Sequence, residues 1–191
     1  WTLERSGEGL KSKARAVAKA GVTALLVRLP SNQRERVKEY FELRFWKGVH
    51  NDIATLDPAG QAARLEHEKA HYPFFFMDFF GLTPEDFAGK KLLDIGCGPM
   101  GSLEWADMAA ERVGLDPLAD RYLALGASKH AMRYVKGVSE SIPFPDGHFD
   151  VVSTFNSLDH VADVDATIRE IMRVTGPGGT ILLITEIDHD P

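Results

Sequence analysis

The stretch Lys91-Leu92-Leu93-Asp94-Ile95-Gly96-Cys97-Gly98-Pro99-Met100-Gly101 joins a short apolar run to a cluster of glycines. A short apolar run bounded by glycines predicts a buried β-strand followed by a sharp turn. We expect a helix after the turn, over 103–112, with N–H groups at its start that are free to bind an anionic group. A tight strand-to-helix turn without a ligand would have the same pattern, so this stretch leaves both interpretations open.

The chain beyond this stretch repeats the alternation of strand and helix. Further helices are expected over 122–131 and 162–174, and a Thr-Gly-Pro-Gly-Gly turn over 175–179. The further strands are expected over 112–116, 133–137, 149–155 and 180–186. Short apolar strands that alternate with helices predict an α/β fold, a Rossmann-like parallel sheet with helices on both faces. Ligands of such sheets bind at the carboxyl ends of the strands.

The region before Gly89 has a different pattern. Apolar residues recur at the helical period over 10–29, 32–46 and 57–71, and an aromatic run follows at 74–80. These segments predict an N-terminal helical region over residues 1–88. We expect most of the aromatic run to be core, with some rings covering a substrate site.

Composition narrows the functional classes. The 191 residues are 44% hydrophobic and 26% charged, with one cysteine and a net charge of −6. No apolar stretch is long enough to span a membrane, and one cysteine allows no internal disulfide. Residues 1–50 contain 11 basic and 5 acidic residues, whereas residues 91–191 contain 8 and 16. This asymmetry predicts two parts with different roles, without the dense basic patch typical of nucleic-acid binding.

A second acidic residue strengthens the ligand-binding interpretation of the glycine loop. Asp116 ends the next expected strand, 22 residues after Asp94. A carboxylate at that place can bind both hydroxyls of a ribose, although it can also simply cap a helix. The segment Ile142–Asp150, read IPFPDGHFD, and the Gly-Pro-Gly-Gly-Thr turn follow in order.

Together these four motifs, over about residues 88–188, resemble the class I S-adenosylmethionine-dependent methyltransferases of the small-molecule group. The acid stands ahead of the glycines, which is unlike a dehydrogenase loop. The resemblance implies S-adenosyl-L-methionine as cofactor and S-adenosyl-L-homocysteine as product. It also implies a methyltransferase domain over 89–191, with residues 1–88 as a helical cap that forms the substrate segment.

The resemblance also implies a role for individual residues. Gly96 and Gly98 would pass close to the methionine part of the cofactor, and Asp94 would hold its amino group directly or through water. Asp116 would bind the ribose hydroxyls, and Asn156 would face the sulfonium. The remaining expected cofactor-binding residues are Cys97 in the loop, Pro117 and Leu118 beside the adenine, and Ser139 and Glu140 at its edge.

Three features depart from the family pattern. Met100 stands where a third glycine is common, and Gly101 follows one place later. Val138 stands where a carboxylate often meets the adenine amino group, which leaves a backbone group or Glu140 for that contact. The family usually completes a seven-stranded sheet with a β-hairpin, whereas strands six and seven are missing here or lie beyond residue 191.

His160 is the expected catalytic residue. It follows the fourth strand of the domain, close to the expected methyl position, and could accept a proton from a hydroxyl or amine acceptor. Packing against, or capping of, the following helix is the other interpretation. Cys97 in the glycine loop could be a low-pKa nucleophile, but a small structural residue is the simpler interpretation.

His67-Glu68-Lys69-Ala70-His71 formally matches the zinc-protease pattern H-E-x-x-H. The nearby Pro73 and the lack of a third ligand argue against a metal site, and we expect no metal. Two histidines lining a substrate pocket, or a surface helix turn, are the alternatives.

The sequence therefore predicts an enzyme that methylates oxygen, nitrogen or carbon of a small molecule. A sensor or scaffold that binds S-adenosylmethionine without catalysis is an alternative, as is methylation of a protein or lipid-linked acceptor. The basic segment 10–29 could also contact a membrane surface. No signal peptide is visible, Trp1 suggests a trimmed chain, and a cytoplasmic location is expected. The pattern does not indicate an oligomeric state.

Overall fold

The computed structural model describes residues 30–185, and the expected helix over 10–29 lies outside them. The chain divides into two compact units, residues 1–45 and 46–191. Helix α2 (Ser31–Ala54) begins in the first and ends in the second. It extends past the expected end at Trp46. The proposed functional boundary between residues 88 and 89 is a separate division, which stays a prediction.

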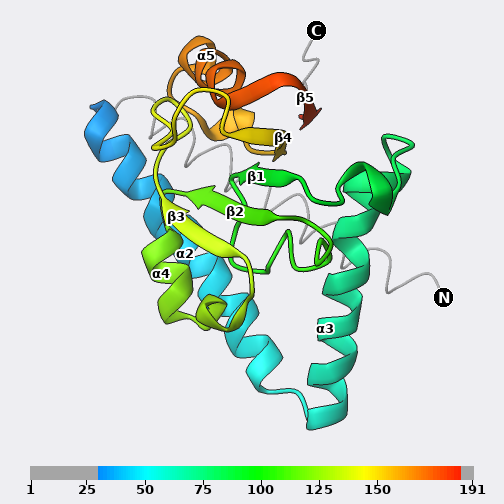
Figure 1. Ribbon diagram of the computed structural model, residues 1–191. Coiled ribbons are helices and arrows are strands. Elements are labelled where there is room, and N and C mark those ends of the chain that lie inside the picture. The colour runs from blue at the N-terminus through cyan, green and yellow to red at the C-terminus, as the bar shows by residue number, and fades with distance from the viewer. Residues whose placement is uncertain (1–29, 186–191) are drawn as a thin grey trace, which may run out of the picture. The chain divides into compact units, whose positions relative to one another are not determined.

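A five-stranded parallel sheet forms the centre of the second unit (Figure 1). Its strands are β1 (Lys91–Ile95), β2 (Glu111–Asp116), β3 (Arg133–Lys136), β4 (Phe149–Phe155) and β5 (Thr175–Ile184). Their order is β3-β2-β1-β4-β5, and all four neighbouring pairs are parallel. The predicted Rossmann-like α/β fold is confirmed, and β1 and β4 have the bounds that the sequence predicted.

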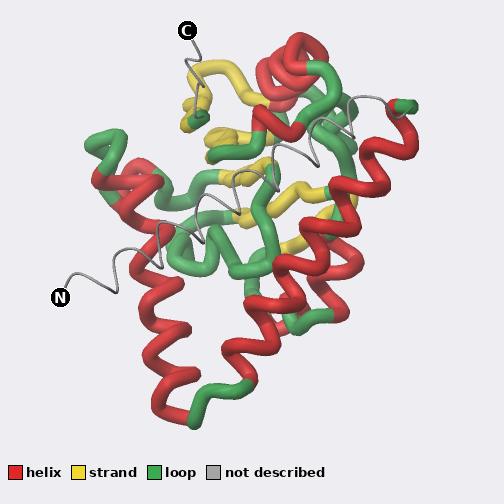
Figure 2. The backbone as a smooth tube through the Cα atoms, turned by 180° about the vertical axis from the view of Figure 1, so that it is seen from behind, coloured by secondary structure: helices red, strands yellow, loops and turns green. Residues whose placement is uncertain are grey.

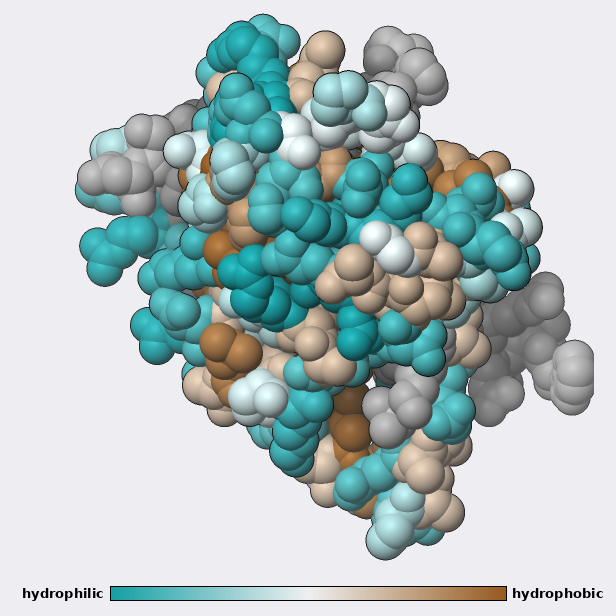
Figure 3. Space-filling model, in the orientation of Figure 1, coloured by the Kyte–Doolittle hydropathy of each residue, from teal (hydrophilic) through white to brown (hydrophobic). Residues whose placement is uncertain are grey.

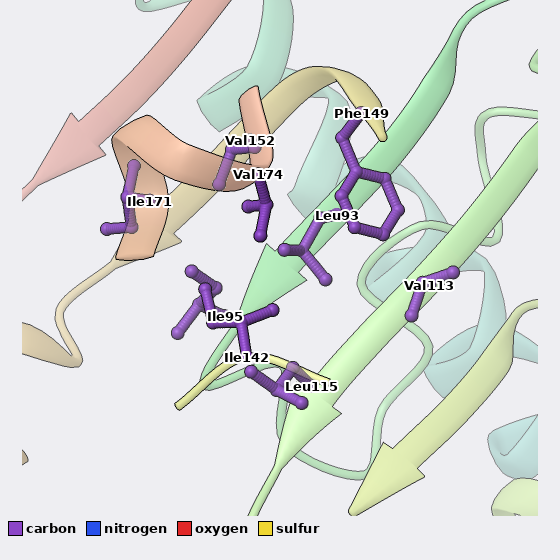
Figure 4. Packing of buried hydrophobic residues seen from close by; sticks show 9 residues of the cluster. All are labelled: Leu93, Ile95, Val113, Leu115, Ile142, Phe149, Val152, Ile171 and Val174. Carbon is purple, nitrogen blue, oxygen red and sulfur yellow. The ribbon is translucent and has the colours of Figure 1, made fainter. Parts of the chain in front are cut away.

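The hydrophobic core of the sheet includes side chains of β1 and of the strands on both sides of it. One hydrophobic cluster contains residues of three strands, of the segment before β4 and of α5 (Val164–Val174) (Figure 4). Its members are Leu93, Ile95, Val113, Leu115, Ile142, Phe149, Val152, Ile171 and Val174. Helix α5 begins at Val164 because the Asp163 carboxylate caps it, accepting the Ala166 N–H at 2.8 Å. Burial of these apolar side chains holds the strand ends in place.

The helical region of the second unit ends at a cluster of aromatic residues. Helix α3 (Pro58–Pro73) starts after its N-cap Asp57, whose side chain accepts the Gly60 N–H at 2.7 Å, and a short loop joins it to α2 (Figure 2). The aromatic run continues it as one π-helical turn, η1 (Phe74–Asp78), and a 3-10 turn, η2 (Pro84–Asp86), precedes β1. The molecular face in Figure 3 is mostly hydrophilic, with apolar residues in small areas.

The prediction of a helix over 103–112 was wrong. Residues 98–110 form turns and bends without a helix, and β2 already begins at Glu111. Long-range bonds compete with the helical pattern: the Arg112 guanidinium donates to the carbonyls of Leu103 and Glu104, each at 3.4 Å. The Glu104 carboxylate in turn accepts the Met132 N–H at 2.8 Å. The glycine loop is therefore not followed by a helix N-terminus.

Two other boundaries differ from the predictions. Helix α4 (Ala119–Ala124) is shorter than predicted over 122–131, because Gly126 has a φ of 115° and only a 3-10 turn, η3 (Ala127–Lys129), follows. Strand β5 includes the predicted turn over 175–179, since Thr175 already pairs with Phe149 across a bulge. The φ of Gly126 and the strand pairing of Thr175 are properties of the folded backbone, which the local sequence pattern does not indicate.

Candidate functional site at the carboxyl edge of the sheet

The loop that follows β1, residues 96–101, is here named the cofactor loop. Gly96, Gly98 and Gly101 all have positive φ, at 72°, 57° and 74°. The third glycine of the loop is thus Gly101, one place after Met100, as the sequence suggested. The Gly101 N–H donates to the Tyr134 hydroxyl at 3.1 Å, which ties the end of the loop to β3.

Asp116 lies against the cofactor loop. It is buried, and its Oδ2 accepts the Gly98 N–H at 3.2 Å while its Oδ1 accepts the Leu118 N–H at 2.8 Å. The structure therefore brings together Gly98, Asp116 and Leu118, which sequence reasoning assigned to one site. Pro117 lies between them and is exposed.

Asp94 lies deeper in the sheet than this site. Its side chain is buried, and its carboxylate accepts the Ser102 hydroxyl at 2.5 Å and the Ser153 hydroxyl at 2.7 Å. Burial raises the pKa of Asp94 to about 6, although both serine bonds favour the charged form. This carboxylate of β1 thus joins Ser102, the residue after the cofactor loop, to β4. Sequence reasoning missed both serines, whose only signal was a polar side chain beside or within a buried strand.

Ser139 and Glu140 lie in the segment after β3. The Gly137 N–H donates to the Asp116 carbonyl at 3.4 Å, so this segment starts beside β2. Further along, the Ser139 hydroxyl bonds Thr167 at 2.9 Å, and the Glu140 carboxylate accepts the Ala162 N–H at 2.7 Å. Both side chains therefore contact α5 or the loop before it. Val138, where the family often has a carboxylate, is exposed.

Asn156 and His160 follow β4 at the same edge of the sheet. Asn156 has a φ of 51°, unusual for a residue with a side chain, and its N–H donates to the Ile184 carbonyl at 2.7 Å. His160 ends the 3-10 turn η4 (Leu158–His160), with its imidazole Nε2 3.5 Å from the Asp159 carboxylate. Its side chain is 71% exposed. The imidazole is thus accessible to a small molecule at this edge.

An aromatic cluster packs on the last residue of β4. Phe155 lies 4.8 Å from Phe76, 6.1 Å from Phe80 and 6.2 Å from Phe75, measured between ring centroids. Phe75 in turn contacts His71 at 4.9 Å. The rings of Phe75, Phe76, Phe80 and Phe155 form the aromatic cluster. Because Phe155 directly precedes Asn156, this cluster brings part of the aromatic run close to that residue. The apolar side of the edge therefore lies next to the position expected for the methyl group.

The other candidates have simpler surroundings. His67 and His71 stack at 6.3 Å between ring centroids on α3. Within residues 30–185, no group of three or more His, Cys, Asp or Glu side chains could hold a metal ion. Cys97 is buried, and a Cβ added at Gly114 would come within 2.5 Å of its sulfur. Its thiol therefore points to β2, where it fills the space that Gly114 leaves.

Residues 93–183, which include the glycine loop, Asp116 and Asn156, match the family described as "Methyltransferase domain". This part of the chain is a class I S-adenosylmethionine-dependent methyltransferase domain. The fit is physical as well, since a buried carboxylate suits a ribose and the adjacent glycines let a ligand approach the backbone closely. S-adenosylmethionine is the cofactor of this family, and it supplies a methyl group already activated on a sulfonium.

Several curated proteins resemble this methyltransferase domain. Tocopherol O-methyltransferase, chloroplastic, of Arabidopsis thaliana is 30% identical over 72% of this chain and 43% of its own length. The ubiquinone/menaquinone biosynthesis C-methyltransferase UbiE of Pseudomonas putida is 38% identical over 51% of this chain and 42% of its own. The chain thus spans less than half the length of these relatives.

A solved structure of an S-adenosylmethionine-dependent methyltransferase from Mesorhizobium loti is also similar. It is 26% identical, with a TM-score of 0.48, over 53% of this chain and 49% of its own. None of the helices within residues 30–185 has the length and apolar character needed to cross a bilayer.

Proposed function

We propose that this protein transfers the methyl group of S-adenosylmethionine to a small, largely apolar acceptor that contains a planar ring. The observation that supports this most is the adjacency of two unlike surfaces at one sheet edge. Two buried carboxylates, Asp94 in β1 and Asp116 at the end of β2, lie beside the cofactor loop, whereas the aromatic cluster packs on Phe155 at the end of β4. The first suits a polar nucleoside cofactor, and the second suits a flat apolar molecule.

The proposed binding roles follow from the donors and acceptors present. The Asp116 carboxylate accepts hydrogen bonds from the ribose hydroxyls, while Gly98 and Gly96 allow the methionine part to approach the backbone. Asp94, through Ser102, carries negative charge toward the cofactor amino group. Pro117 and Leu118 border the adenine, Cys97 packs beneath the loop, and Ser139 and Glu140 lie toward the adenine edge.

The acceptor side has to align a nucleophile with the methyl group and exclude water. The rings of Phe80 and Phe75 orient an aromatic acceptor by stacking, and His71 extends that wall. Asn156 faces the reacting centre. For a hydroxyl acceptor, the His160 imidazole takes the proton as the methyl arrives, and Asp159 orients the ring. The relatives' names include both an O- and a C-methyltransferase, so the assay should include acceptors that can be methylated on oxygen and on carbon.

The test has a binding step and a transfer step. Calorimetry with S-adenosylhomocysteine should show one site per chain, and labelled S-adenosylmethionine should transfer methyl to phenol- or quinol-like acceptors rather than to aliphatic amines. Binding without transfer to any small molecule, protein or lipid-linked acceptor would instead favour a sensor or scaffold. Absence of binding would refute the proposal. Asp120→Ala, which changes an exposed aspartate of α4, is the matched control for Asp116→Ala.

The remaining expectations stay proposals or predictions. A membrane-surface contact through residues 10–29 involves residues outside those described, and a cytoplasmic location stays a prediction.

A further inference from the structure

Ser157 makes a contact that no local sequence pattern indicates. It follows Asn156 after β4, and its hydroxyl lies 3.1 Å from the Ile95 carbonyl and 2.5 Å from the Thr154 hydroxyl. A serine hydroxyl has one proton to donate. Because that proton goes to the Ile95 carbonyl, the buried Thr154 hydroxyl must donate to Ser157. Ser157 therefore links the end of β4 to the first peptide of the cofactor loop.

This first peptide, between Ile95 and Gly96, is held at both of its polar atoms. Its carbonyl accepts the Ser157 hydroxyl, and its N–H donates to the Leu115 carbonyl of β2 at 2.9 Å. A peptide unit is planar, so two bonds on opposite sides fix its rotation. The direction in which the cofactor loop leaves the sheet is thus set by β2 on one side and by Ser157 on the other.

Steric contact reinforces the same link. A Cβ added at Gly96 would lie 2.5 Å from the Ser157 Cβ and 2.8 Å from its hydroxyl oxygen. Gly96 has a φ of 72°, a conformation that already disfavours a side chain. Gly89 has nearly the same φ, 70°, but nothing within 4 Å of the position of its Cβ. Comparing the two glycines therefore separates the effect of a positive φ from the effect of the contact with Ser157.

We propose that Ser157 is a positioning residue for cofactor binding, which fixes the Ile95–Gly96 peptide and packs on Gly96, so that the loops after β1 and β4 form one rigid frame. The inference rests on the proposed function, because it assumes that S-adenosylmethionine binds to this loop. It predicts that the affinity for the cofactor depends on a side chain that need not touch it.

Serine replacement is the first test. Ser157→Ala keeps the Cβ but removes both hydroxyl bonds, and the dissociation constant for S-adenosylhomocysteine should rise about fivefold, the size of one neutral hydrogen bond. Ser128→Ala, at an exposed serine of η3, is the control and should leave it unchanged. If the wild type binds normally and Ser157→Ala binds within twofold of it, this inference is overturned and the proposed function is not. Wild-type protein that does not bind would overturn the proposed function, and this inference with it.

A size exchange tests the steric part. Gly96→Ala should weaken binding and lower the melting temperature more than Gly89→Ala, which carries the same backbone strain. Ser157→Gly in the Gly96→Ala background should recover several-fold in affinity and part of the melting temperature, although Ser157→Gly alone weakens binding. If the affinity of the double variant is no higher than the two single effects multiplied together predict, the contact between Gly96 and Ser157 is contradicted. If Gly96→Ala does not fold, the Ser157→Ala comparison decides.

Discussion

The two halves of the sheet edge are built by different physical means. The cofactor loop after β1 is held by hydrogen bonds to the buried Asp116 of β2 and to Tyr134 of β3, and Ser102, the next residue, bonds the buried Asp94 of β1. The aromatic cluster at the end of β4 is held by ring packing. Hydrogen bonds fix distance and direction, whereas ring contacts tolerate rearrangement. One half therefore suits an invariant cofactor, and the other suits an acceptor that differs among relatives.

The largest expected effect concerns the base on the acceptor side. If the acceptor is a hydroxyl, His160→Asn should lower turnover by about 10²–10⁴-fold, because proton removal is lost. The affinity for S-adenosylhomocysteine and the melting temperature of the same variant should stay near those of the wild type. Turnover within a few-fold of wild type would end the role of His160 as base, and the acceptor half would then act by positioning alone.

Removal of the Asp116 carboxylate tests the cofactor half. Asp116→Ala should weaken S-adenosylhomocysteine binding by about 1.5–3 kcal/mol, because charged hydrogen bonds to the ribose are lost and two backbone N–H groups lose their acceptor. Calorimetry on folded protein measures the change. The exposed Asp120→Ala should bind as the wild type does, and equal affinity of both variants would remove Asp116 from the site.

The pH dependence of stability tests the buried Asp94. Its folded pKa, about 6, lies above the ordinary value of 3.8, so the folded state binds the proton more tightly. Its contribution to the free energy of unfolding is therefore largest below pH 4 and falls as the pH rises to about 6, by roughly 2–3 kcal/mol at most. Urea unfolding at pH 5 and pH 8 should show this decrease in wild type and not in Asp94→Asn. An equal decrease in both would assign it to another group.

The smallest effect is expected in the aromatic cluster. Phe80→Leu keeps an apolar side chain but removes the ring that stacks with Phe155, and should raise the KM of an aromatic acceptor about fivefold. Cofactor affinity should change less than twofold, because the cofactor half does not depend on this ring. Phe79→Leu, at a ring that is 58% exposed, is the control. A parallel loss of cofactor affinity in Phe80→Leu would show that the two halves are not separate.

Local patterns in the sequence were sufficient for the strands and the main motifs. Lys91–Ile95 and Phe149–Phe155 are short apolar runs between turn residues, and Asp57 before Pro58 marks a helix start without any tertiary information. Asp116 was found because a strand end and an acid coincide. The cofactor itself followed from the order of four motifs rather than from any one of them.

Long-range contacts determine what the sequence could not predict. The segment after the cofactor loop has a helical pattern, but Arg112 and Glu104 bind backbone groups outside a helix. The Ser153 hydroxyl reaches Asp94 across 59 residues, and a spacing of that length has no local signature. The adjacency of Phe80 and Phe155 depends in the same way on packing of the chain before β1 against the end of β4.

The strand order also has a consequence for the order of folding events. β1 pairs with β2 about 20 residues away but with β4 about 60 residues away, and loop closure makes the longer pairing slower. Until β4 docks, Ser153 cannot bond the Asp94 carboxylate, so that group stays hydrated. Docking must then remove its water, a step that is easier for the protonated acid. We therefore expect the final refolding phase to be faster at pH 5 than at pH 8, and stopped-flow refolding of Asp94→Asn to lose this difference.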